Sequence, residues 1–95
     1  MTWVIKIHRD AKKFWGKLDE NNKNKILNKL KELIDNLEKG IINWRILKMK
    51  KLKGKLNGLY RIRVGNIRII FEINTKEKVI YVTHIHYRSK VYKKF

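Results

Sequence analysis

Residues 59–73 read LYRIRVGNIRIIFEI, and this stretch decides the fold. Two runs rich in β-branched and aromatic residues flank Gly65-Asn66, which predicts a hairpin with a two-residue turn. Because a turn of this length fixes the register, each residue of the first strand has a predicted partner on the second. One side of the hairpin is then wholly apolar, with Val64 facing Ile67, Ile62 facing Ile69 and Tyr60 facing Phe71.

The other side of the same hairpin carries three arginines. The turn places Arg63 directly opposite Arg68, and Arg61 lies two residues along the first strand. Like charges that face each other destabilise a sheet by a few tenths of a kcal/mol to about 1 kcal/mol. Because a guanidinium group donates two parallel hydrogen bonds to phosphate, the pattern predicts an anion site. The alternative is that all three side chains simply extend into solvent.

The residues before the hairpin predict one strand and two helices. Residues 3–8 are rich in β-branched and aromatic residues and predict the first strand. Asp10 is the candidate N-cap of a short helix that continues to Leu18. Residues 19–22 end that helix and open a second one, which Gly40 terminates. The apolar stripe of the second helix is Ile26, Leu27, Leu30, Leu33, Ile34 and Leu37.

The residues after the hairpin predict a turn at 74–78 and a fourth strand at 79–86. The predicted order is therefore β-α-α-β-β-β, and we expect a single α+β domain over residues 1–95. In this domain, two N-terminal helices pack on one face of an antiparallel sheet. The helices must cover the apolar side of the hairpin, which leaves the arginine side open.

His84 and His86 lie two residues apart in the predicted fourth strand, and hence on one face. If the preceding turn pairs residue 84 with residue 68, both histidines join the arginine side, whereas a slip of one residue sends them into the core. A metal ion is the rival ligand for such a pair. The surrounding cations repel a divalent ion, and no carboxylate or thiol lies nearby in sequence, so we expect neither metal nor cofactor.

The composition is strongly basic. The 95 residues include 25 lysines and arginines and 8 acids, and the formal net charge is +17. Residues 39–71 contain ten basic residues and no acid. A polyanionic partner is expected, with a solvated lysine-rich surface as the alternative. The absence of cysteine excludes disulfides and thiolate catalysis. No apolar run approaches the ~20 residues of a membrane span, so we expect no membrane partner and a cytoplasmic protein.

Arginine, histidine and tyrosine, without a carboxylate pair or cysteine, suit the metal-free cleavage of RNA by its own 2′-hydroxyl group. This reaction needs a base at the 2′-oxygen, an acid at the 5′ leaving oxygen, and cations around a phosphorane whose negative charge grows. Arginines supply the cations, and histidine and tyrosine can supply the base and the acid.

The hairpin, LKG at residues 52–54 and the ending HYRSKVY at residues 86–92 resemble the RelE/ParE toxin superfamily, most closely RelE. The resemblance covers essentially the whole chain. It implies the toxin of a type II toxin–antitoxin system. Such a toxin is a ribosome-dependent endoribonuclease, or mRNA interferase, that cuts messenger RNA in the decoding site and stops translation.

By this resemblance, Arg61, Arg63 and Arg68 hold and stabilise the scissile phosphate. Tyr92 falls on the position proposed to act on the 2′-hydroxyl; alternatively, it anchors the tail against the sheet. Either His86 or Arg88 falls on the position proposed to protonate the leaving oxygen. A histidine suits that role, because its unperturbed pKa is about 6.5.

The resemblance also implies two partners. The first is the ribosome with its mRNA, where lysines of a predicted basic loop dock on ribosomal RNA phosphates. These lysines are Lys48, Lys50, Lys51, Lys53 and Lys55. The second is an acidic, RelB-like antitoxin, which would form a hetero-oligomer and cover the basic surface or displace the C-terminal segment. Two other functions stay open: inhibition of DNA gyrase, as in the ParE branch, and non-catalytic binding of nucleic acid.

Overall fold

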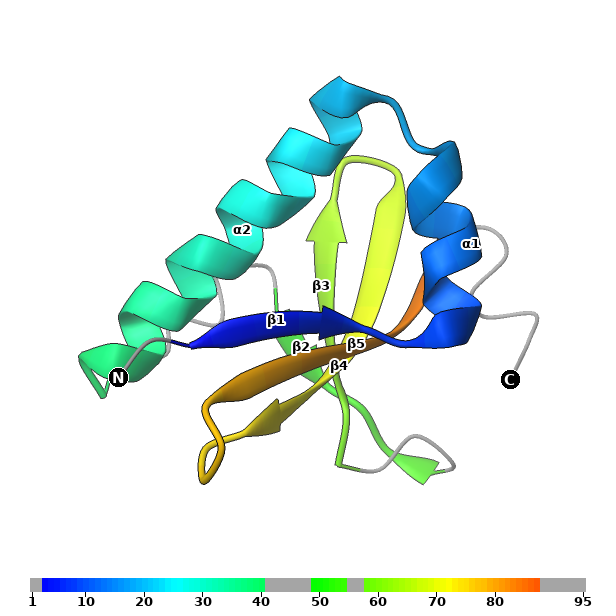
Figure 1. Cartoon of the computed structure of the whole chain (residues 1–95). Coiled ribbons are helices and arrows are strands. Elements are labelled where there is room, and N and C mark those ends of the chain that lie inside the picture. Colours follow the sequence, from blue (N-terminus) through cyan, green and yellow to red (C-terminus); the bar gives the residue numbers. More distant parts are fainter. Residues whose placement is uncertain (1–2, 41–48, 55–57, 88–95) are drawn as a thin grey trace.

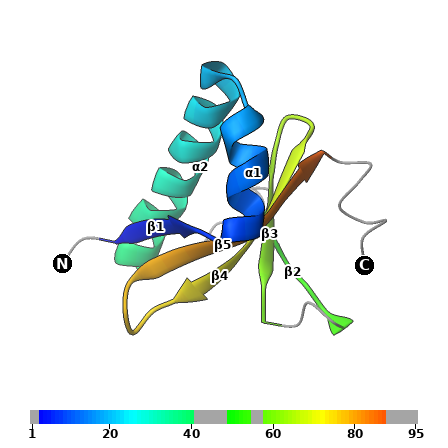
Figure 2. The same cartoon turned by 45° about the vertical axis from the view of Figure 1, so that its right-hand side comes forward.

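The computed structural model describes residues 3–40, 49–54 and 58–87, which form two helices and one five-stranded sheet. In chain order the elements are β1 (Val4–Ile7), α1 (Arg9–Lys17), α2 (Glu20–Glu38), β2 (Met49–Lys51), β3 (Tyr60–Val64), β4 (Ile67–Asn74) and β5 (Val79–Tyr87). The strand order in the sheet is β1-β5-β4-β3-β2. Both helices lie on the same side of the sheet (Figure 1 and Figure 2), which confirms the predicted α+β class.

Each helix is preceded by a residue whose side chain caps its N-terminus. His8 precedes α1, and its Nδ1 accepts a hydrogen bond from the backbone N–H of Asp10 at 3.1 Å. Asp19 precedes α2, and its Oδ1 accepts one from the N–H of Asn22 at 2.8 Å. The prediction that Asp10 caps α1 was wrong, because Asp10 lies in the first turn, where a carboxylate favours the helix dipole. Neither described helix is long and apolar enough to cross a membrane.

The core lies between α2 and the covered face of the sheet. From α2 it takes Ile26, Leu30 and Leu33, none of them more than 1% exposed. From β3, β4 and β5 it takes Ile62, Ile69, Phe71, Ile80, Val82 and Ile85. One face of each strand is thereby used for packing, and the other face is available for polar side chains.

The hairpin register is the one that the turn predicts. Val64 pairs with Ile67, and Arg63 pairs with Arg68. Gly65 has a φ of 59°, a backbone conformation that the first central position of a primed hairpin turn requires and that glycine adopts without steric cost. The turn thus fixes which side of β3 and β4 carries the arginines.

Two features of the sheet differ from the prediction. Residues 49–51 form a short strand, antiparallel to β3, where the sequence predicts a basic loop. Three residues, two of them lysines, are too short a run to show strand alternation. In addition, β1 pairs with β5 in parallel, so the sheet is mixed. This pairing is possible because two helices separate β1 from the rest of the sheet, and parallel neighbours need such a long connection.

Replacing Leu33 tests the packing of α2 on the sheet. Leu33 is fully buried, at 0% exposure. We expect Leu33→Ala to lower the free energy of unfolding by about 2–5 kcal/mol, because it removes apolar contacts and leaves a cavity. Lys31→Ala, at an exposed position of the same helix, should stay within about 0.5 kcal/mol of wild type. Urea denaturation measures the free energy of unfolding of both variants. Equal urea midpoints for the two would contradict the packing of α2 on the sheet.

Candidate functional site

The face of the sheet opposite the helices carries two rows of side chains. In the first row, Arg63 of β3 pairs with Arg68 of β4, which pairs with His86 of β5. The second row crosses four strands and consists of Lys50, Arg61, Ile70 and His84. From the usual strand and residue spacings, the backbone positions of these residues lie within about 16 Å of one another. We define the cationic face as Lys50, Arg61, Arg63, Arg68, His84 and His86.

Arg68 lies at the centre of the cationic face and is buried, with only 4% exposed. Ile70, next to it on β4, is 3% exposed although it lies outside the main core. The expectation of an open arginine face therefore needs correction: Arg61 and Arg63 are half-buried, and only Lys50 among the six residues is exposed. The cause is the central position of β4, which has neighbours on both sides. Partial removal from water strengthens the attraction between a guanidinium group and an anion.

Both histidines lie on the arginine side, as the sequence predicts, but the pairing differs from the predicted one. His86 lies opposite Arg68, and His84 lies opposite Ile70, whereas the prediction paired residue 84 with residue 68. Because the difference is two residues, the rings stay on the predicted side of the sheet.

A β-bulge in β5 determines that side. From the turn up to the pair Phe71–Val82, β4 and β5 follow one register; the next pair is Ile70–His84, so Thr83 is an extra residue. Had the first register continued, both histidines would point into the core. The bulge therefore brings them to the cationic face.

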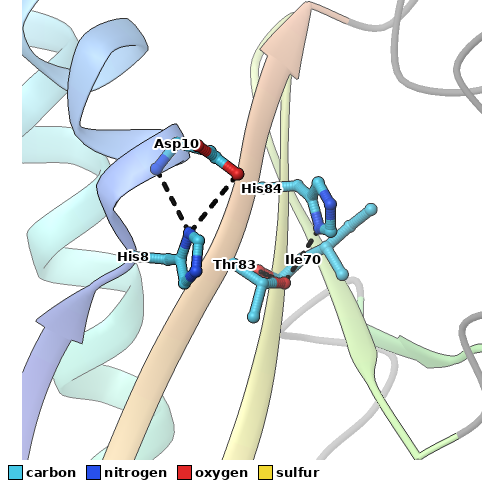
Figure 3. Close-up of polar contacts among 5 residues, drawn as sticks. All are labelled: His8, Asp10, Ile70, Thr83 and His84. Atoms are coloured by element: carbon cyan, nitrogen blue, oxygen red, sulfur yellow. Dashed lines mark hydrogen bonds and ion pairs between the residues drawn. The ribbon is translucent and has the colours of Figure 1, made fainter.

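The side chain of Thr83 holds the bulge. Its Oγ1 donates a hydrogen bond to the backbone carbonyl oxygen of Ile70 at 3.2 Å and lies 2.9 Å from Nδ1 of His84, as Figure 3 shows. The ring centroids of His84 and His86 are 6.5 Å apart. The ring of Phe14 in α1 lies 5.8 Å from that of His86, so α1 helps to fix the second histidine.

The sequence analysis predicted His84 beside the arginines but did not name it among the catalytic residues, and it did not single out Thr83. A signal for the bulge was present in the sequence. Ile80 and Val82 follow the two-residue period of a strand, and the next aliphatic residue in the sequence, Ile85, breaks that period. All three side chains are buried. Such an interruption in an apolar alternation indicates an extra residue.

The structure divides the lysines that the sequence groups as one docking cluster. Lys50 pairs with Arg61 and belongs to the cationic face. Lys51 lies on the opposite side of β2, and Lys53 lies beyond its end; both are exposed. Four predicted site residues fall outside the described residues: Lys48, Lys55, Arg88 and Tyr92.

The arrangement suits the binding of an anion and the transfer of a proton. Arg61, Arg63 and Arg68 present guanidinium groups, which can hold phosphate by paired hydrogen bonds. The two histidines beside them are of the side-chain type that exchanges a proton near neutral pH. Within residues 3–40, 49–54 and 58–87, no three His, Cys, Asp or Glu side chains gather in a way that could hold a metal ion.

The chain is similar in sequence and in fold to proteins of toxin–antitoxin systems. The family model described as ParE toxin of type II toxin–antitoxin system, parDE, matches residues 5–92. The protein named RelE1 from Methanocaldococcus jannaschii is 30% identical over 93 residues, which cover 98% of each chain. A chain of the archaeal RelE–RelB complex from Pyrococcus horikoshii OT3 is 31% identical, with a TM-score of 0.67 over 96% of this chain and 100% of that chain. For the RelB–RelE antitoxin–toxin complex from Methanococcus jannaschii, the identity is 26% and the TM-score is 0.68, over 95% of this chain and 98% of that chain.

The facing pair of arginines predicts an electrostatic cost in the absence of a bound anion. Arg63→Gln removes one of the two like charges, so we expect the free energy of unfolding to rise by a few tenths of a kcal/mol to about 1 kcal/mol. The gain should shrink at high salt, which screens the repulsion. Arg63→Lys keeps the charge and is the control. Urea denaturation at low and high ionic strength measures the free energy of unfolding of both variants. If Arg63→Gln is no more stable than Arg63→Lys at low salt, the predicted repulsion between Arg63 and Arg68 is contradicted.

Proposed function

Because the chain belongs to the RelE/ParE family of toxins of type II toxin–antitoxin systems, we propose that it is an endoribonuclease that cleaves mRNA in the decoding site of the ribosome. The observation that carries this proposal is the row Arg63–Arg68–His86, in which two guanidinium groups and an imidazole occupy facing positions on three adjacent strands. Arg61 adds a third guanidinium group one row away. One phosphodiester could contact all of these groups.

The proposed reaction is a transesterification within the RNA. The 2′-oxygen attacks phosphorus and the bond from phosphorus to the 5′-oxygen breaks, which yields a 2′,3′-cyclic phosphate and a 5′-hydroxyl. The 2′-hydroxyl loses one proton, and the leaving 5′-oxygen gains one. Arg61, Arg63 and Arg68 stabilise the negative charge that grows on the phosphorane.

We assign the proton donor at the 5′-oxygen to His86. The family resemblance leaves His86 and Arg88 as candidates, but a guanidinium group keeps its proton at any relevant pH, whereas an imidazolium readily gives one up. His86 lies directly opposite Arg68, and its ring contacts Phe14. These neighbours support a proton donor next to the phosphate that the arginines would hold. The role that the resemblance gives to Tyr92 stays a prediction.

An acidic antitoxin is the proposed protein partner. The similar chains from Pyrococcus horikoshii OT3 and Methanococcus jannaschii are bound to RelB in their crystal structures. The net charge of +17 makes a negatively charged chain the complementary partner. We propose that the antitoxin forms a hetero-oligomer with this chain and covers the cationic face, which would block access of RNA.

Ribosomal RNA is the proposed docking surface for the lysines near β2. Lys51 and Lys53 are exposed, and Lys50 lies beside them on the cationic face. Contacts between lysines and phosphates release counterions and depend steeply on salt. The proposed place of action is the cytoplasm, where mRNA is translated.

The arginines give the decisive test of the nuclease proposal. We expect Arg61→Ala and Arg68→Ala each to lower the rate of mRNA cleavage on programmed ribosomes by about 10²–10³-fold, because each removes a group that stabilises the phosphorane. Both variants should also lose growth arrest. Primer extension on transcripts after induction in cells, and single-turnover cleavage in vitro, measure these effects.

A matched control removes a charge elsewhere. Lys39→Ala takes away an exposed cation at the end of α2 and should cleave at the wild-type rate. Circular dichroism checks that each variant is folded, which matters most for the buried Arg68. An Arg61/Arg68 double variant that is folded and fully toxic would rule out the proposed function.

Inhibition of DNA gyrase is a second candidate, because the matching family model is that of ParE. An inhibitor of this kind needs no proton donor. His86→Gln should therefore stay toxic if the protein inhibits gyrase and lose toxicity if the protein is a nuclease. A supercoiling assay together with transcript mapping separates the two. Inhibited supercoiling with intact transcripts would favour the gyrase reading.

The exposed lysines predict a salt effect on ribosome binding. In the double variant Lys51→Ala/Lys53→Ala, we expect the plot of log affinity against log salt concentration to become shallower by about 0.7–0.9 for each phosphate that is no longer neutralised. The control Lys12→Ala/Lys39→Ala removes two other exposed lysines and should keep the wild-type slope. Ribosome pelleting at several salt concentrations measures the slope. If both double variants keep it, the lysines near β2 do not dock on RNA.

A further inference from the structure

The two hydrogen-bond contacts of Thr83 point to where the protons of Thr83 and His84 lie. Thr83 Oγ1 is 3.2 Å from the carbonyl oxygen of Ile70 and 2.9 Å from Nδ1 of His84. A carbonyl oxygen can only accept, so the one hydroxyl proton of Thr83 is donated to Ile70. In that arrangement Thr83 Oγ1 accepts a hydrogen bond from His84, and Nδ1 of His84 carries the proton.

This tautomer decides what His84 can do. A neutral imidazole carries a proton on only one of its two nitrogens, so Nε2 of His84 is the nitrogen with the lone pair. The base in the proposed RNA cleavage needs such a lone pair. The ring belongs to a half-buried residue of the cationic face, in the same row as Arg61.

The spacing of the two histidines suits a pair that acts on one phosphodiester. In an in-line displacement the attacking and leaving oxygens lie on opposite sides of phosphorus. A base and an acid must each come within about 2.6–3.2 Å of their oxygens. The ring centroids of His84 and His86 are 6.5 Å apart, so one phosphodiester that lies across the edges of both rings could contact them through its two in-line oxygens. Arg68 pairs with His86 on the neighbouring strand.

We propose that His84 is a further catalytic residue, the base that takes the proton of the 2′-hydroxyl on Nε2, and that Thr83 is the residue that positions it. As the 2′-oxygen forms its bond to phosphorus, its proton passes to Nε2 and makes His84 an imidazolium. The bond to the 5′-oxygen breaks, and that oxygen takes a proton from protonated His86. Exchange of protons with water restores both rings.

This inference rests on the proposed nuclease function, and it differs from what the family resemblance implies. The resemblance gives the step at the 2′-hydroxyl to Tyr92, and the geometry gives it to His84. On the cationic face, Ile70 lies directly opposite His84, and Arg68 and His86 lie two residues along their strands. Arg61 and Lys50 lie farther along the same row as His84.

The tautomer can be measured without any RNA. Two-bond ¹⁵N–¹H correlation spectra of the full chain with ¹⁵N-labelled histidine, recorded where the ring is neutral, show which nitrogen carries the proton. We expect Nδ1–H at His84 in wild type and in Thr83→Ser, which keeps the hydroxyl. Thr83→Val has the same shape without the hydroxyl and should shift His84 toward the Nε2–H form. An Nε2–H tautomer in the wild type would overturn the inference.

The catalytic role is measured by single-turnover cleavage on programmed ribosomes as a function of pH. We expect His84→Gln to lower the rate constant by about 10²–10⁴-fold and to lose the limb that rises from acidic pH. Thr83→Val should lower the rate constant about tenfold, which corresponds to the loss of one hydrogen bond, and leave ribosome affinity unchanged. Thr83→Ser should keep the wild-type rate constant. The control is His8→Asn, which keeps an N-cap residue for α1 and should match wild type.

The outcomes separate this inference from the proposed function. If wild type cleaves no mRNA, the nuclease proposal fails and the catalytic role of His84 fails with it, whatever the tautomer. If wild type cleaves and folded His84→Gln cleaves equally well, only the inference is overturned. The same holds if Tyr92→Phe, rather than His84→Gln, removes the acidic limb of the pH profile.

Discussion

The facing pair Arg63–Arg68 is the constraint around which the rest of the structure is arranged. Two like charges at facing positions of a sheet repel, at a cost of up to about 1 kcal/mol. The same strands bury Ile62 and Ile69 on their other face, each at 0% exposure, against the helices. Small domains are typically stable by about 5–15 kcal/mol, so this core can offset the repulsion. The apolar face of the hairpin thus holds the charged face in place, and the two faces cannot be changed independently.

The strand β5 contributes to the core and also carries both histidines, and its neighbour on one side changes partway along its length. Its first half pairs with β1, and the backbone N–H of His8 donates to the carbonyl oxygen of Val82 at 2.7 Å where that pairing ends. The bulge at Thr83 follows at once. Beyond it, α1 takes the place of β1, with Phe14 against His86. A change of register is easiest to accommodate at such a point, because only β4 is still paired with the strand and has to adjust to it.

The sequence determines some of these features through local chemistry and others only through the assembled sheet. The hairpin and its arginines were predictable, because Gly65 sits in a turn whose length sets the register. The pairing of β4 with β5 was not, because its turn has a positive φ of 57° at Lys78, where no glycine marks the position, and because Thr83 then shifts the register. The parallel pairing of β1 depends on contacts far apart in the chain, and the three residues of β2 are too few to show a pattern. The proposed role of Tyr92 came from the family resemblance alone.

The two histidines give the cationic face groups that could carry out chemistry. Without them, its arginines and lysine could only bind an anion. Guanidinium groups keep their protons at any relevant pH, so the three arginines can hold a phosphate but exchange nothing with it. Imidazoles can exchange protons, and here both lie on β5 beyond its bulge. There the two-residue period of the strand sets their spacing more firmly than a loop would. Whether that pair faces the arginines at all depends on one extra residue. With the continuous register of the first half of β5, the same two rings would lie in the core, and the cationic face would have no group to accept a proton.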